Sequence, residues 1–101
     1  MGSIIFTTTN KLAEGMRISH ILLNKKLAAC VKLFENVRSF YWWKGKIESA
    51  NEIQLMIITQ KNLVEKVFSE IKKIHSYEVP EMIEIQIGRI NKDYLDWISK
   101  V

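Results

Sequence analysis

The sequence has little of the residue types that mark linkers and disulfide frameworks: 101 residues contain one proline, four glycines and one cysteine. Without a Pro- or Gly-rich stretch, residues 1–101 are expected to form a single domain. The lone Cys30 excludes an internal disulfide and is typical of a reducing compartment. No apolar run approaches the ~20 residues that span a bilayer, and the first residues do not resemble a signal peptide. We therefore expect a cytoplasmic protein with no membrane contact.

An excess of charge of one sign is also missing. Fifteen Lys and Arg residues against eleven Asp and Glu residues give a net charge of +4, and the basic residues are scattered. Nucleic-acid-binding proteins concentrate their basic charge on one face, and RNA-recognition domains need stacking aromatic residues on two central strands. The first predicted strand offers only Phe6. The sequence therefore predicts no nucleic-acid partner.

Residues 3–9 hold a short apolar run that is typical of a central strand buried on both faces. Apolar residues repeat with a period of two in three further segments and with helical spacing in three others. The predicted strands are residues 3–9, 27–43, 47–59 and 82–87, and the predicted helices begin after the N-cap candidates Asn10, Asn62 and Asn91. Right-handed crossovers place the first two helices on one face of a four-stranded antiparallel sheet. The predicted fold is α+β, a ferredoxin-like βαββαβ arrangement with a long hairpin and an extra C-terminal helix.

The hairpin is too long for the domain that carries it. An uninterrupted strand from Ala28 to Trp43 would span roughly 50 Å, whereas a domain of this size has a radius of gyration near 13 Å. We expect the strand to bend at Glu35 and Asn36, or its tip to project. Four aromatic residues, 40–43, occupy the tip, and leaving them in water forgoes several kcal/mol. The hairpin predicts an obligate homo-oligomer; the alternative is that these rings fold back onto their own sheet.

Two residues are candidate metal ligands. His75 follows a predicted helix and lies near Tyr77 and Glu81, and an imidazole beside carboxylates can hold Cu(II) or Zn(II). Cys30 offers a thiolate, although no chelating spacing links it to a histidine. The alternatives are that His75 hydrogen-bonds a protein group and that Cys30 packs as a small hydrophobic residue.

The sequence offers one pair of carboxylates for acid–base chemistry. Glu48 and Glu52 are expected on one face of the third strand. The alternative is that they pair with Arg38, Lys44 or Lys46 across the hairpin. No Gly-rich phosphate-binding turn is present.

Four segments together resemble the divalent-cation tolerance family, CutA: residues 27–31 (LAACV), 41–48 (YWWKGKIE), 75–81 (HSYEVPE) and 94–97 (YLDW). The resemblance covers nearly the whole chain. It implies a ferredoxin-like subunit, a tight homotrimer and an architecture similar to the PII signalling proteins. It further implies a role in tolerance of copper and other divalent cations, and no enzymatic activity.

The resemblance also bears on the site residues. In some family members copper ligation is attributed to a cysteine that ends the first strand and to paired histidines before the tyrosine. Here Thr7 and Ile74 stand at two of those positions, Ser76 replaces a proline, and His75 is kept. The remaining polar and aromatic residues are expected to line clefts between subunits: Trp43, Lys46, Glu48, Glu52, His75, Tyr77 and Glu81.

Three functions remain open at this stage. The first is a trimeric protein of cation tolerance that requires no cofactor and binds Cu(II), another divalent cation or a small ligand weakly. The second is a ligand-free scaffolding trimer or a PII-like signalling trimer. The third is an enzyme that uses carboxylates between subunits.

Overall fold

The computed structural model describes all 101 residues. Its strands are β1 (Gly2–Thr9), β2 (Cys30–Trp43), β3 (Lys46–Gln60) and β4 (Ile83–Gln86), and its α-helices are α1 (Leu12–Asn24), α2 (Val64–Ile74) and α3 (Lys92–Ser99). The strands pair antiparallel in the order β2-β3-β1-β4. The predicted α+β, ferredoxin-like fold with a long β2-β3 hairpin and a C-terminal helix is confirmed.

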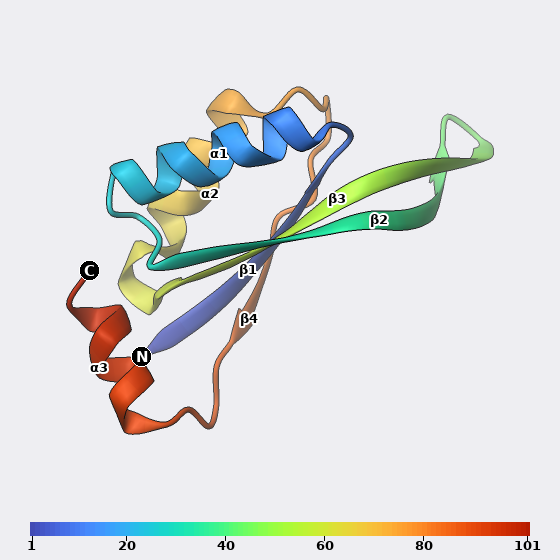
Figure 1. Cartoon of the computed structure of the whole chain (residues 1–101). Coiled ribbons are helices and arrows are strands. Elements are labelled where there is room, and N and C mark those ends of the chain that lie inside the picture. Colours follow the sequence, from blue (N-terminus) through green and yellow to red (C-terminus); the bar gives the residue numbers. More distant parts are fainter.

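Helices α1 and α2 cover one face of the sheet (Figure 1). Their apolar stripes pack on the strand residues that point to this face. The buried core consists of Ile5, Ile18, Leu22, Ala28, Ile53, Leu55, Ile57, Val64, Val67 and Ile71. Helix α1 comes close to the sheet because residue 15 is glycine: a Cβ there would lie 3.3 Å from a methyl group of Leu55 and from the Thr9 hydroxyl. This packed layer supports the end of β1 and the middle of β3, next to the candidate site.

The opposite face of the sheet is largely uncovered. Helix α3 crosses one end of it, where Ile98 is buried near Gly2. Away from α3, Ile83 and Ile85 pair with Phe6 and Ile4 of β1 and are about half exposed. Because strand partners share a face, these apolar side chains form an open surface on the side of the sheet away from α1 and α2.

Strand β2 bends where the sequence predicts a break. Phe34 pairs with Gln54, and Val37 with Glu52, so that three steps on β2 oppose two on β3. This is a β-bulge with one extra residue. Asn36 within it has a φ of +61°, a left-handed conformation that asparagine tolerates better than most residues.

The bulge divides the aromatic residues of the hairpin between its two faces. Beyond the bulge, Tyr41 pairs with Glu48, so odd-numbered residues of β2 share the helix-free face with even-numbered residues of β3. Tyr41 and Trp43 therefore point to that face, and Phe40 and Trp42 point to the other. The two pairs of rings thus meet different surroundings.

The hairpin projects beyond the rest of the sheet (Figure 1). The molecule measures 45 × 26 × 22 Å and its radius of gyration is 14.2 Å, against about 12.7 Å for a compact chain of this length. Phe40 and Trp42 are 70% and 73% exposed. The alternative in which the aromatic residues fold back onto their own sheet is therefore wrong for these two rings within one protomer.

The second strand begins later than predicted, at Cys30 rather than at residue 27. Helix α1 ends in a Schellman-type motif, in which the amides of Lys26 and Leu27 donate to the carbonyls of Leu23 and Leu22. Lys26 adopts the left-handed conformation that this motif requires, with a φ of +57°. The apolar residues after α1 therefore belong partly to the helix end.

Two of the three predicted N-caps are wrong. Lys11 rather than Asn10 precedes α1. A 3₁₀ turn occupies the position of Asn62, so α2 begins only at Val64. Asn91 is the N-cap of α3 as predicted, although its side chain makes no capping hydrogen bond.

Helix α3 buries less than its pattern indicates. Ile98 is 1% exposed, but the apolar residues Trp97 in the helix and Val101 after it are 47% and 40% exposed. None of the helices combines the length and apolar character needed to cross a membrane.

Candidate functional site

A cleft of about 880 Å³ lies between the hairpin strand β2, at residues 39–43, and the segment that follows α2. Aromatic and acidic side chains dominate its lining. The lining residues are Thr8, Ser39, Phe40, Tyr41, Trp42, Trp43, Glu52, Ser76, Tyr77, Glu78, Val79, Pro80 and Glu81. Four of the residues expected from the sequence therefore meet there: Trp43, Glu52, Tyr77 and Glu81.

His75 anchors the segment after α2 to the end of β1. Its side chain is fully buried. The ring Nε2 lies 2.7 Å from the carbonyl oxygen of Thr8, and Nδ1 lies 3.0 Å from the amide nitrogen of Tyr77. Because a carbonyl can only accept and an amide N–H can only donate, Nε2 carries the proton and Nδ1 accepts. Both ring nitrogens are therefore engaged within the protomer.

Ser76 fixes the same segment to α1. Its amide and its hydroxyl donate to the two carboxylate oxygens of Glu14, at 2.7 and 2.9 Å. Glu14 lies in the first turn of α1, 62 residues away in the sequence. With the bonds of His75, these contacts hold the turn at residues 75–77 against two elements.

Tyr77 connects this turn to β3. Its hydroxyl donates to Oε2 of Glu52 at 2.6 Å, and Glu52 is only 7% exposed. Burial of the phenol raises the pKa of Tyr77, and the hydrogen bond to the Glu52 carboxylate raises it further. Tyr77 is therefore a firm donor at neutral pH that compensates the buried carboxylate.

Glu81 forms the acidic counterpart of Glu52 across the cleft. Burial raises the pKa of the Glu81 carboxyl, and the charge of Glu52 raises it further. Glu78, between Tyr77 and Glu81 in the sequence, also lines the cleft. The site therefore concentrates negative charge in a chain whose net charge is +4.

Three of the seven residues expected at the cleft do not line it: His75, Lys46 and Glu48. Lys46 and Glu48 pair with Trp43 and Tyr41 and share their face, but both are exposed and neither lines the cleft. The pairing of Glu48 and Glu52 with basic residues across the hairpin is wrong. No ion pair involves either carboxylate, because Glu52 is bonded to Tyr77 instead.

The two predicted metal ligands lie apart. Cys30 pairs with Ile58 of β3, whereas His75 is bonded to Thr8, which pairs with Gln54. Four residues of strand separate these rows, or roughly 13 Å. No group of three or more His, Cys, Asp or Glu residues is arranged to hold a metal ion. Within one protomer, these residues do not fit a copper site of the histidine–cysteine type.

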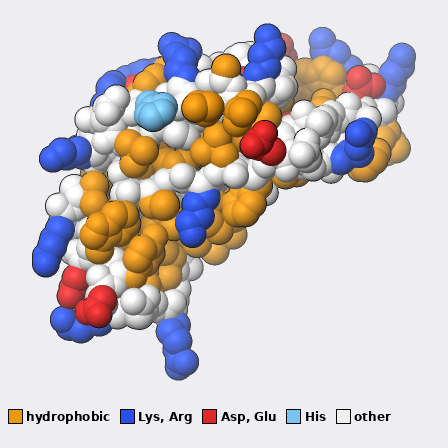
Figure 2. All heavy atoms as spheres, in the orientation of Figure 1, with side chains coloured by type: hydrophobic (Ala, Val, Ile, Leu, Met, Phe, Trp, Pro, Cys, Tyr) orange, Lys and Arg blue, Asp and Glu red, His pale blue; other side chains and the backbone are white.

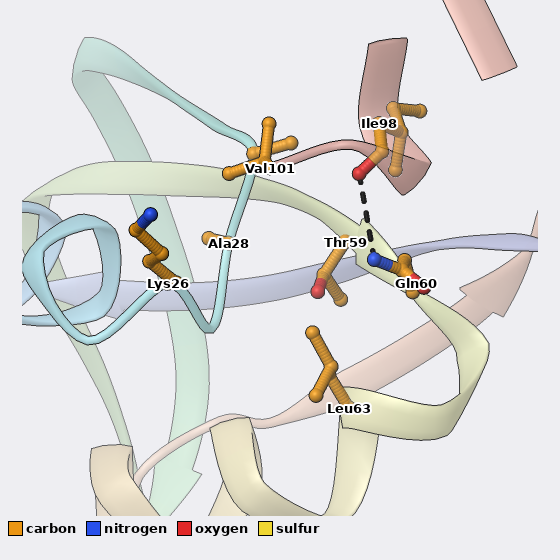
Figure 3. Close-up of a pocket in the computed structure, with 8 residues that line it drawn as sticks. Lys26, Ala28, Thr59, Gln60, Leu63, Ile98 and Val101 are labelled. Atoms are coloured by element: carbon orange, nitrogen blue, oxygen red, sulfur yellow. Dashed lines mark hydrogen bonds between the residues drawn. The ribbon is translucent and has the colours of Figure 1, made fainter. Parts of the chain in front are cut away.

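A second hollow lies between the start of β2, the end of β3 and α3 (Figure 3). Ala28, Leu63 and Ile98 line it, and the side chain of Gln60 donates to the carbonyl of Ile98 at its edge. It has no room for a water molecule. This notch is a packing feature and not a ligand site.

Four residues expected at clefts between subunits, Trp43, Glu52, Tyr77 and Glu81, line this cleft of a single protomer. Sequence reasoning missed the residues that hold the cleft together. Thr8 and Glu14 act through a backbone carbonyl and a carboxylate more than 60 residues from their partners. No spacing in the sequence signals such contacts. Tyr41 could have been found, because it lies two residues from Trp43 in an alternating strand.

The protein-family model for "CutA1 divalent ion tolerance protein" matches residues 3–101. The divalent-cation tolerance protein CutA of Archaeoglobus fulgidus is 43% identical over 100 residues, which cover 99% of this chain and 97% of that protein. The protein of the same name from Pyrococcus horikoshii is 38% identical over 95 residues, which cover 94% of this chain and 92% of that protein.

Solved structures give the same result. The periplasmic divalent cation tolerance protein CutA from Archaeoglobus fulgidus superimposes with a TM-score of 0.96 at 43% identity, over 99% of this chain and 97% of that one. CutA1 from Pyrococcus horikoshii superimposes with a TM-score of 0.93 at 36% identity, over 97% of this chain and 95% of that one.

Proposed function

The chain belongs to the CutA1 family of divalent ion tolerance proteins, and from this premise we propose that it acts in cation tolerance as a cytoplasmic homotrimer. The trimer binds Cu(II), another divalent cation or a small ligand weakly, at clefts between its subunits. The observation that carries the proposal is the position of the acidic and aromatic cleft, directly beside apolar surface that one protomer leaves uncovered.

The exposed surface of the protomer supports self-association. It is 6713 Å², against about 5,900 Å² for a compact monomer of 11.8 kDa. The difference is close to the ~800 Å² that each partner contributes to a standard interface. Figure 2 shows hydrophobic side chains along the projecting hairpin, with basic side chains at its end. The large exposed apolar residues of the hairpin and the open sheet face include Phe34, Phe40, Trp42, Ile47, Ile83 and Ile85.

The three-fold stoichiometry is taken from the family. A contact that joins the hairpin of one copy to the open sheet face of the next is heterologous, and such contacts close into rings when the rotation permits. A neighbouring copy packed against the β2-β3 hairpin would also cover the cleft, since Tyr41 and Trp43 belong both to the hairpin surface and to the lining of the cleft.

The carboxylates of Glu52 and Glu81 are the groups in the cleft best suited to a divalent cation. His75 is a poorer candidate than its sequence position indicated, because its ring nitrogens already serve Thr8 and Tyr77. Two carboxylates do not complete a coordination sphere. Water or residues of a neighbouring copy would supply the other ligands, and for this reason the proposed affinity is weak.

The proposed function is non-catalytic and intracellular. Of the two carboxylates considered for acid–base chemistry, Glu48 is exposed and Glu52 is bonded to Tyr77. Cys30 is a free thiol, which is typical of a reducing compartment, although the Archaeoglobus relative is described as periplasmic. Cell fractionation of the native protein tests the location.

Light scattering coupled to size exclusion tests the assembly. The expected mass is about 35 kDa between 1 and 100 µM, three times that of one chain. A stable particle of 11.8 kDa at 10 µM would overturn the homotrimer and the shared cleft together.

Calorimetric titration of the assembled protein with Cu(II) and Zn(II) tests the ligand. We expect weak binding that Glu52→Gln and Glu81→Gln reduce and that Glu65→Gln, on an exposed part of α2, leaves unchanged. His75→Ala tests the sequence-based assignment directly: equal binding by this variant and the wild type removes His75 from the list of ligands. Turnover of any substrate that is lost in Glu48→Gln would revive the enzymatic alternative.

A further inference from the structure

The cleft has the composition of a site for a positively charged ligand. Three of its lining residues are acidic, Glu52, Glu78 and Glu81, and none is lysine, arginine or histidine. Acidic residues are a minority in the chain as a whole, which carries a net charge of +4. This local reversal of sign disfavours anionic ligands such as nucleotides and carboxylic acids.

The aromatic residues of the cleft also favour a positively charged ligand. Tyr41, Trp43 and Tyr77 contribute their rings to its walls. The face of an aromatic ring carries negative charge and attracts ammonium and guanidinium groups within about 6 Å. One contact of this kind already exists at the edge of the cleft, where the Lys44 ammonium lies 5.8 Å from the centre of the Trp43 ring.

The size of the cleft favours an organic ligand over a bare metal ion. In the single protomer, before a neighbour covers it, its volume is about 880 Å³, which lies toward the upper end of the range of sites for small organic molecules. A bare ion needs several ligands within about 2.5 Å, and no cluster of three metal-ligating side chains is present. Aromatic walls add contact area for an apolar body and add nothing to the coordination of a metal ion.

The walls are held in place without the ligand. Tyr77 is bonded to Glu52 and to Nδ1 of His75, and its ring packs 4.7 Å from the His75 ring. Glu52 is 7% exposed and keeps its orientation through the Tyr77 hydroxyl. Ligand binding therefore needs little ordering of this wall, which favours affinity.

We propose that the cleft binds an organic cation, a small molecule with an ammonium or guanidinium group on an apolar body. The charged group lies among Glu52, Glu81 and the ring faces, and the apolar body lies along Tyr41 and Trp43. This inference rests on the proposed function, since it concerns the same cleft in the assembled protein, and it specifies the chemical class of the ligand.

Three probes that differ mainly in charge test the proposal: benzylammonium, benzyl alcohol and benzoate. We expect the assembled protein to bind benzylammonium at least about tenfold more tightly than either of the others, as measured by calorimetry and tryptophan fluorescence. Glu81→Gln should weaken benzylammonium binding about tenfold. Glu48→Gln, on the same hairpin face but outside the cleft, should leave it unchanged.

Several outcomes would overturn the inference. Equal binding of the three probes would mean that the cleft recognises only apolar surface, and stronger binding of benzoate would reverse the assigned charge. Absence of benzylammonium binding by an assembled protein that still binds Cu(II) or Zn(II) would refute the organic cation and leave the proposed function intact. If Glu81→Gln weakens assembly instead, a basic side chain of a second copy fills the cleft and the small ligand is refuted.

Discussion

Strand β3 passes through two environments, and the contrast explains much of this molecule. At its C-terminal half, Leu55 and Ile57 are fully buried beneath the helices, whereas Ile47 on the hairpin is 63% exposed. The apolar side chains of one strand are thus buried within the protomer at its C-terminal end and exposed at its N-terminal end. Most of the buried apolar packing lies in the helix-covered body, whereas the hairpin exposes apolar surface that a second copy could cover.

The sharpest way to break this comparison is a pair of truncations on β3. Leu55→Ala should lower the free energy of unfolding by about 3 kcal/mol, because it leaves a cavity in a packed core. Ile47→Ala should change the stability of the protomer by less than about 0.5 kcal/mol. Urea denaturation at several protein concentrations measures both.

Protein concentration distinguishes the two environments. Assembly adds to apparent stability in a concentration-dependent way, so any loss caused by Ile47→Ala should depend on concentration, and the loss caused by Leu55→Ala should not. Similar, concentration-independent losses in both variants would show that the hairpin is packed within its own protomer.

The second prediction concerns assembly. Trp42→Ser should raise the dissociation constant of the oligomer by about 30- to 100-fold, because truncation of a central aromatic residue at an interface costs about 2 kcal/mol or more. Sedimentation over a range of concentrations measures the shift. Ser49→Ala, on the same hairpin face beside Phe40, is the matched control. If Trp42→Ser has no effect, the exposed ring lies outside the contact between copies.

The third prediction tests the hydrogen bond between Tyr77 and Glu52, at the junction between the helix-covered body and the hairpin. Tyr77→Phe removes the hydroxyl that compensates the buried Glu52 carboxylate, and should lower the free energy of unfolding by about 1–3 kcal/mol. Tyr41→Phe, whose hydroxyl has no bonded partner, should change it far less. Equal effects of the two variants would mean that Glu52 finds another donor.

Alkaline pH offers an independent test of Tyr77. Its pKa is raised in the folded protein by burial and by Glu52, so its contribution to stability is complete below the unfolded pKa near 10 and is lost as the pH rises beyond that value. The wild type should therefore lose more stability than Tyr77→Phe between pH 9 and 11. Parallel pH profiles would argue against the buried hydrogen bond.

The fourth prediction concerns acid. Because the pKa of Glu81 is raised by burial and by the Glu52 charge, protonated Glu81 stabilises the fold below about pH 4.5, and this contribution is lost as the pH rises through the folded pKa. Glu81→Gln should therefore melt at a higher temperature than the wild type at pH 7, and the difference should vanish at pH 4. Glu48→Gln, an exposed carboxylate, should show no such crossover.

The body was more predictable than the junction because local patterns determine it. Alternation in residues 53–59 and the helical stripe of residues 63–74 specify one buried face each, which leaves few ways to stack helices on a sheet. The bulge at residues 35 and 36 was visible as a polar break, but its effect on the faces of Tyr41 and Trp43 was not. That effect depends on the pairing register, which the sequence does not state.

The site was predictable as a set of residue types and not as a geometry. Aromatic and acidic residues in two segments were expected at clefts between subunits. The alternative in which His75 hydrogen-bonds a protein group is confirmed, but the sequence did not identify the groups to which it is bonded. Thr8 offers a carbonyl and Tyr77 an amide at the end of α2, and a buried imidazole satisfies both. Such long-range partners determine what a histidine can still bind, and no local pattern records them.

The smallest predicted effect tests whether the hairpin has a local stability of its own. Lys44 and Gly45 form its two-residue turn with φ values of +50° and +81°, a geometry that favours Asn-Gly. Lys44→Asn should raise the free energy of unfolding slightly, by about 0.5 kcal/mol, since relief of the left-handed strain exceeds the loss of the contact between Lys44 and the Trp43 ring. Lys46→Asn, just outside the turn, controls for removal of a positive charge. A net loss of stability in Lys44→Asn alone would instead show that the contact between the ammonium and the Trp43 ring contributes more than relief of the turn strain. The aromatic tip would then be partly stabilised within its own chain. The contrast between the hairpin and the helix-covered part would be smaller than the exposed fractions indicate.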